Sequence, residues 1–236
     1  MIGGSVEISD GEVTKAVGDW RFTPISVAGD SNGLFTEVSF SLMGLTKPNN
    51  DVGLFVLDQR PSTSPGSAWS RLLAFCLEPD RSLMNYSSDN VATFNNPYTV
   101  KSLTGAGYAS ASGAINELWG RYYSFVNSDT TAAAFQVTLW ELAYGTTDRN
   151  LSTGHFVLNT LGLVRTTAED WLTSLDGSGP MAQGLVVLQD DATAQRNNQD
   201  LLAQGQVPEP GMLGLLAAGL VGLGLARRSA RRQRQA

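Results

Sequence analysis

The chain of 236 residues is poor in the residue types that most often carry protein chemistry. It contains one cysteine, Cys76, and one histidine, His155. A single cysteine excludes a fold that is stabilised by disulfides within the chain. One cysteine and one histidine also provide none of the usual zinc ligand sets. A Gly-rich phosphate loop and an Asp-x-Asp-x-Asp calcium loop are absent too, so we expect no metal and no cofactor.

Lysine is scarce as well, with Lys15, Lys47 and Lys101 as the only three. The chain has 16 Lys and Arg residues and 22 Asp and Glu residues; five of the arginines and one acidic residue, Glu209, lie in residues 207–236. The part before residue 207 therefore carries a net charge of −10. An acidic surface of this kind argues against a nucleic-acid partner.

The long uncharged apolar run of the chain is at its C-terminus, from Gly211 to Ala226. As a helix it would be about 24 Å long, slightly less than a hydrocarbon core of about 30 Å. Pro208-Glu209-Pro210 precedes the run, and an arginine cluster over 227–234 follows it. Because arginines next to a membrane segment stay in the cytoplasm, we expect everything before Pro208 to lie outside.

This order of parts resembles the PEP-CTERM sorting signal of exported Gram-negative proteins. The resemblance implies that Pro208, Glu209 and Pro210 are recognised by an exosortase-type processing enzyme. It also implies attachment to the bacterial inner membrane through the apolar helix, or a cell-surface or extracellular location after sorting. A plain C-terminal membrane anchor is the alternative.

Residues 1–7 do not have the basic and apolar regions of a signal peptide. Since a C-terminal sorting signal requires export, we expect the natural protein to begin upstream of Met1. Retention in the cytoplasm is the alternative, and the tail argues against it.

Hydrophobic patterns predict strands first and helices later. Val38, Phe40 and Leu42 alternate with polar residues, which is typical of a half-buried strand. Further strands are predicted over 53–57, 71–77 and 185–188. We expect an α+β fold: a β-sandwich or barrel-like scaffold with a helical insertion, followed by a C-terminal hydrophobic helix. The expected divisions are a domain over 1–190, a polar spacer over 191–206 and the sorting signal over 207–236.

Three helices are predicted within the insertion. The first begins near Ser112, and its aromatic residues at helical spacing are interpreted as core. The second has Ser128 or Asp129 as its N-cap and Gly145 just after its end. The third runs from Thr166 to about residue 175, with Thr166 and Glu169 as a capping box.

Two short segments suggest a chemical function. The first is an aromatic residue, the cysteine and a hydrophobic residue, Phe75-Cys76-Leu77; sixty residues later, Phe135-Gln136 is followed by Leu139-Trp140. In this pairing the chain resembles the thioester domains of bacterial surface adhesins. The resemblance implies an internal thioester between the Cys76 sulfur and the Gln136 side-chain carbonyl, with Phe75, Phe135, Leu139 and Trp140 as the apolar pocket around it.

An external amine or hydroxyl that attacks such a bond becomes covalently attached through Gln136. This is one turnover and not enzymatic catalysis, so no catalytic residue is assigned. The expected target is a protein or polysaccharide of a surface, matrix or biofilm. The first alternative is a passive extracellular matrix protein, in which Cys76 is a small buried hydrophobe and Gln136 never reacts. The second is a cysteine hydrolase that pairs Cys76 with His155.

Overall fold

The computed structural model describes residues 8–9, 12–13, 18–22, 33–61, 70–81, 98–190 and 199–205. The chain divides into two compact units, residues 1–205 and residues 206–236. The described residues all belong to the first unit. The expected C-terminal helix over 211–226 lies outside them. Among the described helices, none is long and apolar enough to cross a membrane.

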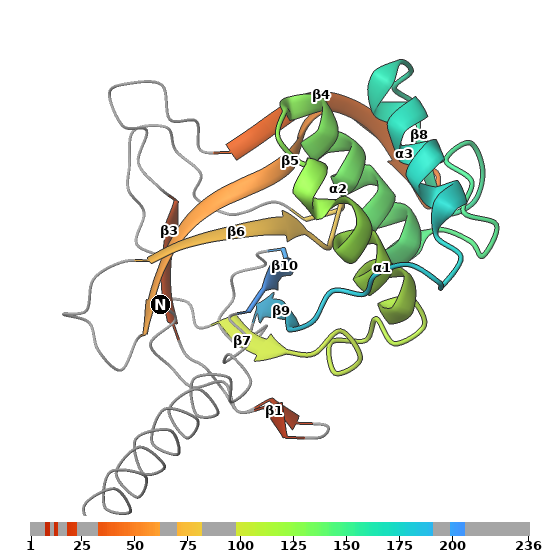
Figure 1. The fold of residues 1–236 in the computed structure, drawn as a ribbon. Coiled ribbons are helices and arrows are strands. Elements are labelled where there is room, and N and C mark those ends of the chain that lie inside the picture. The colour runs from red at the N-terminus through yellow and green to blue at the C-terminus, as the bar shows by residue number, and fades with distance from the viewer. Residues whose placement is uncertain are drawn as a thin grey trace, which may run out of the picture. The chain divides into compact units, whose positions relative to one another are not determined.

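The first unit is built on one antiparallel sheet of eight strands (Figure 1). Seven of them follow the order β7-β9-β10-β6-β5-β4-β8, and β3 pairs with the end of β5. Their bounds are β3 Gly18–Phe22, β4 Gly33–Leu42, β5 Leu45–Pro61, β6 Ser70–Cys76, β7 Tyr98–Lys101, β8 Phe156–Leu158, β9 Leu185–Asp190 and β10 Leu201–Gln204. Two further strands, β1 (Ile8–Ser9) and β2 (Glu12–Val13), pair only with each other.

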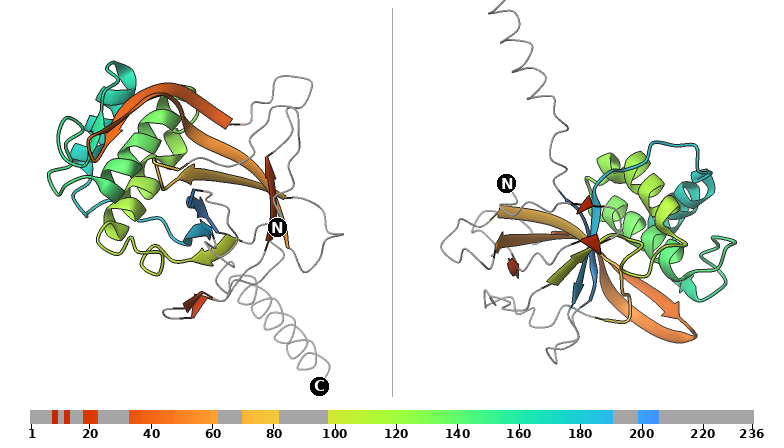
Figure 2. Two further views of the ribbon diagram at one scale, coloured as in Figure 1. Left: turned by 180° about the vertical axis from the view of Figure 1, so that it is seen from behind. Right: turned by 90° about the horizontal axis from the view of Figure 1, so that it is seen from below.

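Three helices and a short 3-10 turn lie between β7 and β9 in the chain, and they gather on one side of the sheet (Figures 1 and 2). Their bounds are α1 Ser112–Tyr122, η1 Tyr123–Phe125, α2 Asp129–Tyr144 and α3 Leu163–Ser174. The predicted mixture of helices and antiparallel strands is therefore confirmed, as is the place of the helices in the chain.

Helix α2 is the central helix of the domain. Its N-cap is Ser128, whose side chain accepts a hydrogen bond from the backbone N–H of Thr131, and Gly145 follows its last turn, as the sequence predicts. All ten residues from 132 to 141 are buried, because α2 packs against α1, α3 and strands of the sheet at the same time. A helix that is enclosed in this way is apolar on most of its surface.

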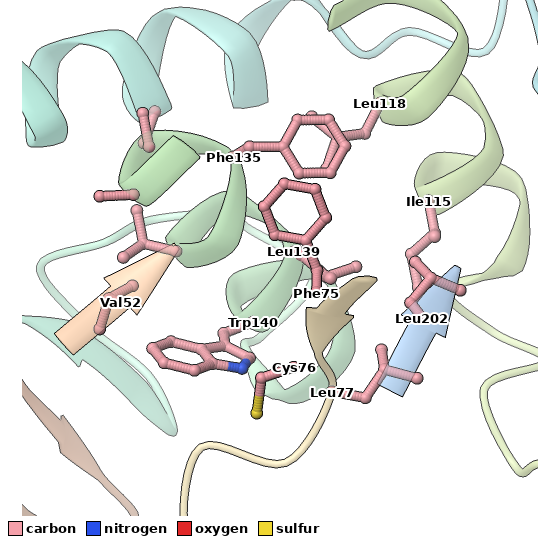
Figure 3. Packing of buried hydrophobic residues seen from close by; sticks show 14 of the residues in the cluster. Val52, Phe75, Cys76, Leu77, Ile115, Leu118, Phe135, Leu139, Trp140 and Leu202 are labelled. Carbon is pink, nitrogen blue, oxygen red and sulfur yellow. The ribbon is translucent and has the colours of Figure 1, made fainter. Parts of the chain in front are cut away.

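Both faces of the sheet carry buried apolar side chains. On the helix side, residues such as Val52, Phe75 and Leu202 join α1, α2 and α3 in the main core (Figure 3). On the other side, a second cluster includes Leu57, Leu72 and Leu188. This explains why 185–188 is a continuous apolar run and not an alternating one. The aromatic residues of α1 are largely core, since Trp119 is buried and Tyr122 stacks on Trp171.

The structure corrects three sequence expectations. The described strands, apart from β1 and β2, form a single sheet covered by helices, and no second facing sheet is seen among them. Helix α3 begins at Leu163, after Gly162 with φ +94°, so Thr166 lies within the helix and donates to the Gly162 carbonyl instead of forming a capping box. Part of the expected spacer, residues 201–204, is strand β10 between β9 and β6.

Candidate functional site

Cys76 is the last residue of β6, at a point where the sheet opens. On one edge of β6, Cys76 lies opposite Leu201 of β10. On the other edge, pairing with β5 ends at Ala74, which lies opposite Phe55. In an antiparallel sheet the N–H and C=O of one residue point to the same neighbouring strand. Where β5 no longer pairs with β6, these two groups of Cys76 therefore need another partner.

Gln136 of α2 is that partner. The N–H of Cys76 donates to Gln136 Oε1 at 2.8 Å, and Gln136 Nε2 donates to the Cys76 carbonyl at 2.6 Å. The Gln136 side chain is completely buried. One side-chain amide thus occupies the place of a neighbouring strand, and it lies against the backbone of the residue that carries the sulfur. The structure brings together the two residues that the sequence singled out.

The Cys76 sulfur itself faces polar groups. Its S–H donates to Gln199 Oε1 and also faces the carbonyl oxygen of Glu78, which lies 3.2 Å from Sγ. The indole ring of Trp140 lies beside Cys76, with its nitrogen on the side nearest that residue (Figure 3). Cys76 and Gln199 are 3% and 4% exposed, so this arrangement is almost closed to water.

Burial raises the pKa of the Cys76 thiol far above its usual range, and the carboxylates of Glu78 and Asp80 raise it further. The backbone of Glu78 and the indole N–H of Trp140 act in the opposite direction but do not outweigh burial. The thiol is therefore protonated at neutral pH. A buried, protonated cysteine reacts slowly with external reagents.

Acidic and phenolic groups lie around the sulfur. Glu78 accepts the backbone N–H of Asp200 at 2.8 Å, and burial together with the charge of Asp200 raises the pKa of Glu78. Tyr108 and Tyr144 lie near Glu78, and burial raises the pKa of Tyr108 above its usual range. Burial raises the pKa of Tyr144 to about 12. Glu78, Tyr108 and Tyr144 are partly buried and Asp80 is exposed, so solvent can reach these members of the group.

The four predicted pocket residues are all buried, but in two places. Phe75 and Phe135 stack on each other, with ring centroids 4.5 Å apart. Trp140 contacts Phe40 with ring centroids 5.0 Å apart, on the side where Cys76 lies. Leu139 is completely buried in the core. The aromatic rings therefore exclude water around the contact between Cys76 and Gln136.

His155 does not belong to this arrangement. It is exposed, and it directly precedes β8, which is separated from β6 by β4 and β5 in the sheet. Three strand spacings of about 4.8 Å put these strands roughly 14 Å apart. The structure thus does not bring Cys76 and His155 together. Within the described residues there is also no group of three or more His, Cys, Asp or Glu side chains that could hold a metal ion.

Sequence reasoning missed Gln199 and Asp200, because they lie in a polar stretch that looked like a spacer. The available signal was the short apolar run Leu201-Leu202-Ala203 that follows them. Three residues are too few to display a strand period, but their apolar character is explained by their position in the middle of the sheet.

Comparison with known families adds one finding. Residues 206–232 match the model of the PEP-CTERM protein-sorting motif. Neither the search of curated proteins nor the search of solved structures gives a match for this chain. Pro208, Glu209 and Pro210 fall within the matched range, outside the described residues. The motif is one that exosortase-type enzymes recognise, and it implies that this protein is exported and sorted to the membrane or cell surface.

Proposed function

We propose that the domain forms an internal thioester between the Cys76 sulfur and the Gln136 side-chain carbonyl and uses it for covalent attachment outside the cell. The observation that carries the proposal is the completely buried amide of Gln136, hydrogen-bonded through both polar atoms to the backbone of Cys76. The sorting motif supports it, since an unpaired cysteine is uncommon in an exported chain.

Thioester formation needs no further reactant. The sulfur attacks Cδ of Gln136, the thiol proton passes to Nε2, the C–N bond breaks and ammonia leaves. The N–H of Cys76 already donates to Oε1, so it stabilises the negative charge that develops on this oxygen. The Cys76 carbonyl accepts a hydrogen bond from Nε2, the nitrogen that leaves as ammonia. For this step the Cys76 sulfur must reach Cδ, and rotation about the Cα–Cβ bond is the side-chain motion by which it would do so.

Attachment is the second step. An amine attacks Cδ, the C–S bond breaks, and the proton that the amine loses ends on the sulfur as a thiol. A hydroxyl reacts in the same way and gives an ester. The partner then remains bound through Gln136. Because the bond is buried, water is kept from it. The expected targets are protein amines or polysaccharide hydroxyls of a surface or biofilm matrix.

The passive alternative also has an observation in its favour. By replacing the missing strand at Cys76, Gln136 fulfils a structural role that requires no reaction. In that case the protein is an exported matrix component with a free, buried thiol. The two functions differ in covalent structure, which a mass measurement distinguishes.

The test is the intact mass of freshly purified full-length protein. A thioester lowers the mass by one ammonia relative to the Cys76→Ala variant, after allowance for the substitution. Methylamine should then add to Gln136, as located by peptide mapping, and release one titratable thiol. Cys76→Ser and Gln136→Glu should each abolish both effects. An unmodified mass together with no methylamine adduct would leave the passive function. The exposed Gln183→Ala serves as the matched control and should behave as wild type.

A further inference from the structure

Two polar side chains at the Cys76 sulfur have no part in the pairing with Gln136. Gln199 contacts the sulfur directly, since its Oε1 accepts a hydrogen bond from Sγ. Trp140 is on α2, one helical turn after Gln136, and its indole nitrogen lies toward Cys76 (Figure 3). Both side chains are 4% exposed.

The indole N–H of Trp140 is buried and has no hydrogen-bond partner within the described part of the chain. Burying a donor without an acceptor is costly, and native structures seldom do so without a reason. The group beside it that can act as an acceptor is the Cys76 sulfur (Figure 3), and the N–H lowers the pKa of that thiol. A neutral thiol is a weak acceptor, whereas a thiolate is a strong one. The donor therefore matches the charged form of the sulfur better than the neutral form.

Gln199 suits both forms. With Oε1 toward the sulfur, as here, it accepts the S–H. A half-turn of the terminal amide presents Nε2–H instead, because oxygen and nitrogen occupy equivalent places in this group. The same side chain then donates to a thiolate. The backbone of Glu78 also favours a negative charge on the buried sulfur, whereas the carboxylates of Glu78 and Asp80 oppose it.

We infer that Trp140 Nε1–H and the side-chain amide of Gln199 form a thiolate-binding site that holds the Cys76 sulfur as a leaving group. This inference rests on the proposed thioester. When an amine attacks Cδ of Gln136, the electron pair of the breaking C–S bond goes to Sγ. As the bond breaks, the sulfur returns to its position beside Gln199 and Trp140, where the two N–H groups stabilise that charge until the proton lost by the amine nitrogen reaches the sulfur. Gln199 and Trp140 thus set the rate of opening, while Gln136 remains the acyl group.

The experiment measures the rate of opening by methylamine in the full-length protein, as adduct mass and as released thiol. Trp140→Phe removes the N–H and keeps an aromatic ring; Gln199→Leu removes the amide and keeps a similar volume. We expect each variant to open at least about tenfold more slowly, because each loses a hydrogen bond to the charged sulfur. The controls Trp171→Phe, a residue that stacks on Tyr122, and the exposed Gln183→Leu should open at the wild-type rate.

A second readout does not need the thioester. The S–H stretching band in the Raman spectrum is measured in proteins whose Cys76 thiol is free, either opened by methylamine or unable to form the bond. In these proteins Gln199→Leu should shift the band, because the acceptor Gln199 Oε1 is gone. Wild-type opening rates in both variants, or an unshifted S–H band, would overturn the inference while the thioester stands. Methylamine found on Gln199 would overturn it as well, since Gln199 would then be the acyl group. If wild type shows no loss of ammonia, the proposed function itself fails.

Discussion

At the scale of single residues, Gln136 combines a structural and a chemical role. Its amide supplies the hydrogen bonds that β5 no longer gives to Cys76. The sequence motif leads one to expect that alanine at either position changes the chemistry and spares the fold. For Gln136 the structure leads to a different prediction, because two buried backbone groups depend on its side chain.

The structural part of this role can be measured where no thioester can form. In a Cys76→Ala background, we expect Gln136→Ala to lower the free energy of unfolding by about 2–4 kcal/mol, since an N–H and a C=O are left buried and unpaired. Urea denaturation of the single and double variants gives the difference. Gln183→Ala in the same background controls for loss of a glutamine at an exposed position. A double variant as stable as Cys76→Ala would mean that Gln136 does not support the sheet.

Glu141, next to Trp140 on α2, makes stability depend on pH. Neither of its carboxylate oxygens has a hydrogen-bond partner in the described part of the chain, and burial raises its pKa from 4.5 to about 8. In the unfolded chain this carboxyl ionises near its ordinary pKa of 4.5. Between pH 4.5 and about 8 the folded state therefore keeps a proton that the unfolded state has lost. The contribution of Glu141 to stability is therefore full below about pH 4.5 and is lost as the pH rises to about 8.

We expect Glu141→Gln to remove this dependence. The variant should melt several degrees higher than wild type near pH 8, because the neutral amide avoids a buried charge, and the gain should shrink toward about pH 5. Thermal unfolding at several pH values measures both effects. Glu37→Gln, at an exposed position on β4, is the control and should leave the pH dependence unchanged. An equal shift at all pH values would show that titration of Glu141 is not the cause.

At the scale of elements, β10 is decisive for the site. It joins β9 to β6, and its Leu201 lies opposite Cys76. It also directly follows Gln199 and Asp200, which contact the sulfur and Glu78. Four residues from a stretch that looks like a linker therefore connect two parts of the sheet and complete the surroundings of Cys76.

This gives a prediction about truncation. A chain that ends at Gly205 should unfold cooperatively, because the first unit is then complete, whereas a chain that ends at Asp190 should lose the fold. In the full chain, Leu202→Asp should destabilise by several kcal/mol, since Leu202 is completely buried; Gln183→Asp, at an exposed position before β9, should cost little. Circular dichroism melting curves distinguish the variants. A folded chain ending at Asp190 would show that β10 is dispensable.

At the scale of the whole molecule, the sequence predicted what depends on local pattern. The helices over 112–122 and 129–144 follow from spacing and caps, and the strand with Val38 and Phe40 from alternation. It did not predict the opening between β5 and β6 or the insertion of Gln136 into it, since these depend on contacts between segments far apart in the chain. The start of α3 was missed because Gly162 gives no side-chain cap that a pattern could detect.

The matched sorting motif and the candidate site lie in separate units of the chain, residues 206–236 and residues 1–205. Export and chemistry should therefore be separable. Replacing Pro208 and Pro210 by alanine should prevent processing by an exosortase-type enzyme, so that the protein accumulates in the membrane fraction at its unprocessed size. The same variant should still lose one ammonia and still add methylamine at Gln136, because no residue around Cys76 is changed. Fractionation of cells followed by intact mass measurement gives both readouts. As a control, Gln206→Ala alters a residue beside the proline motif and should leave sorting intact. If the double proline variant is sorted normally, the tail acts as a plain anchor; if it loses the amine reactivity, sorting and thioester formation are coupled.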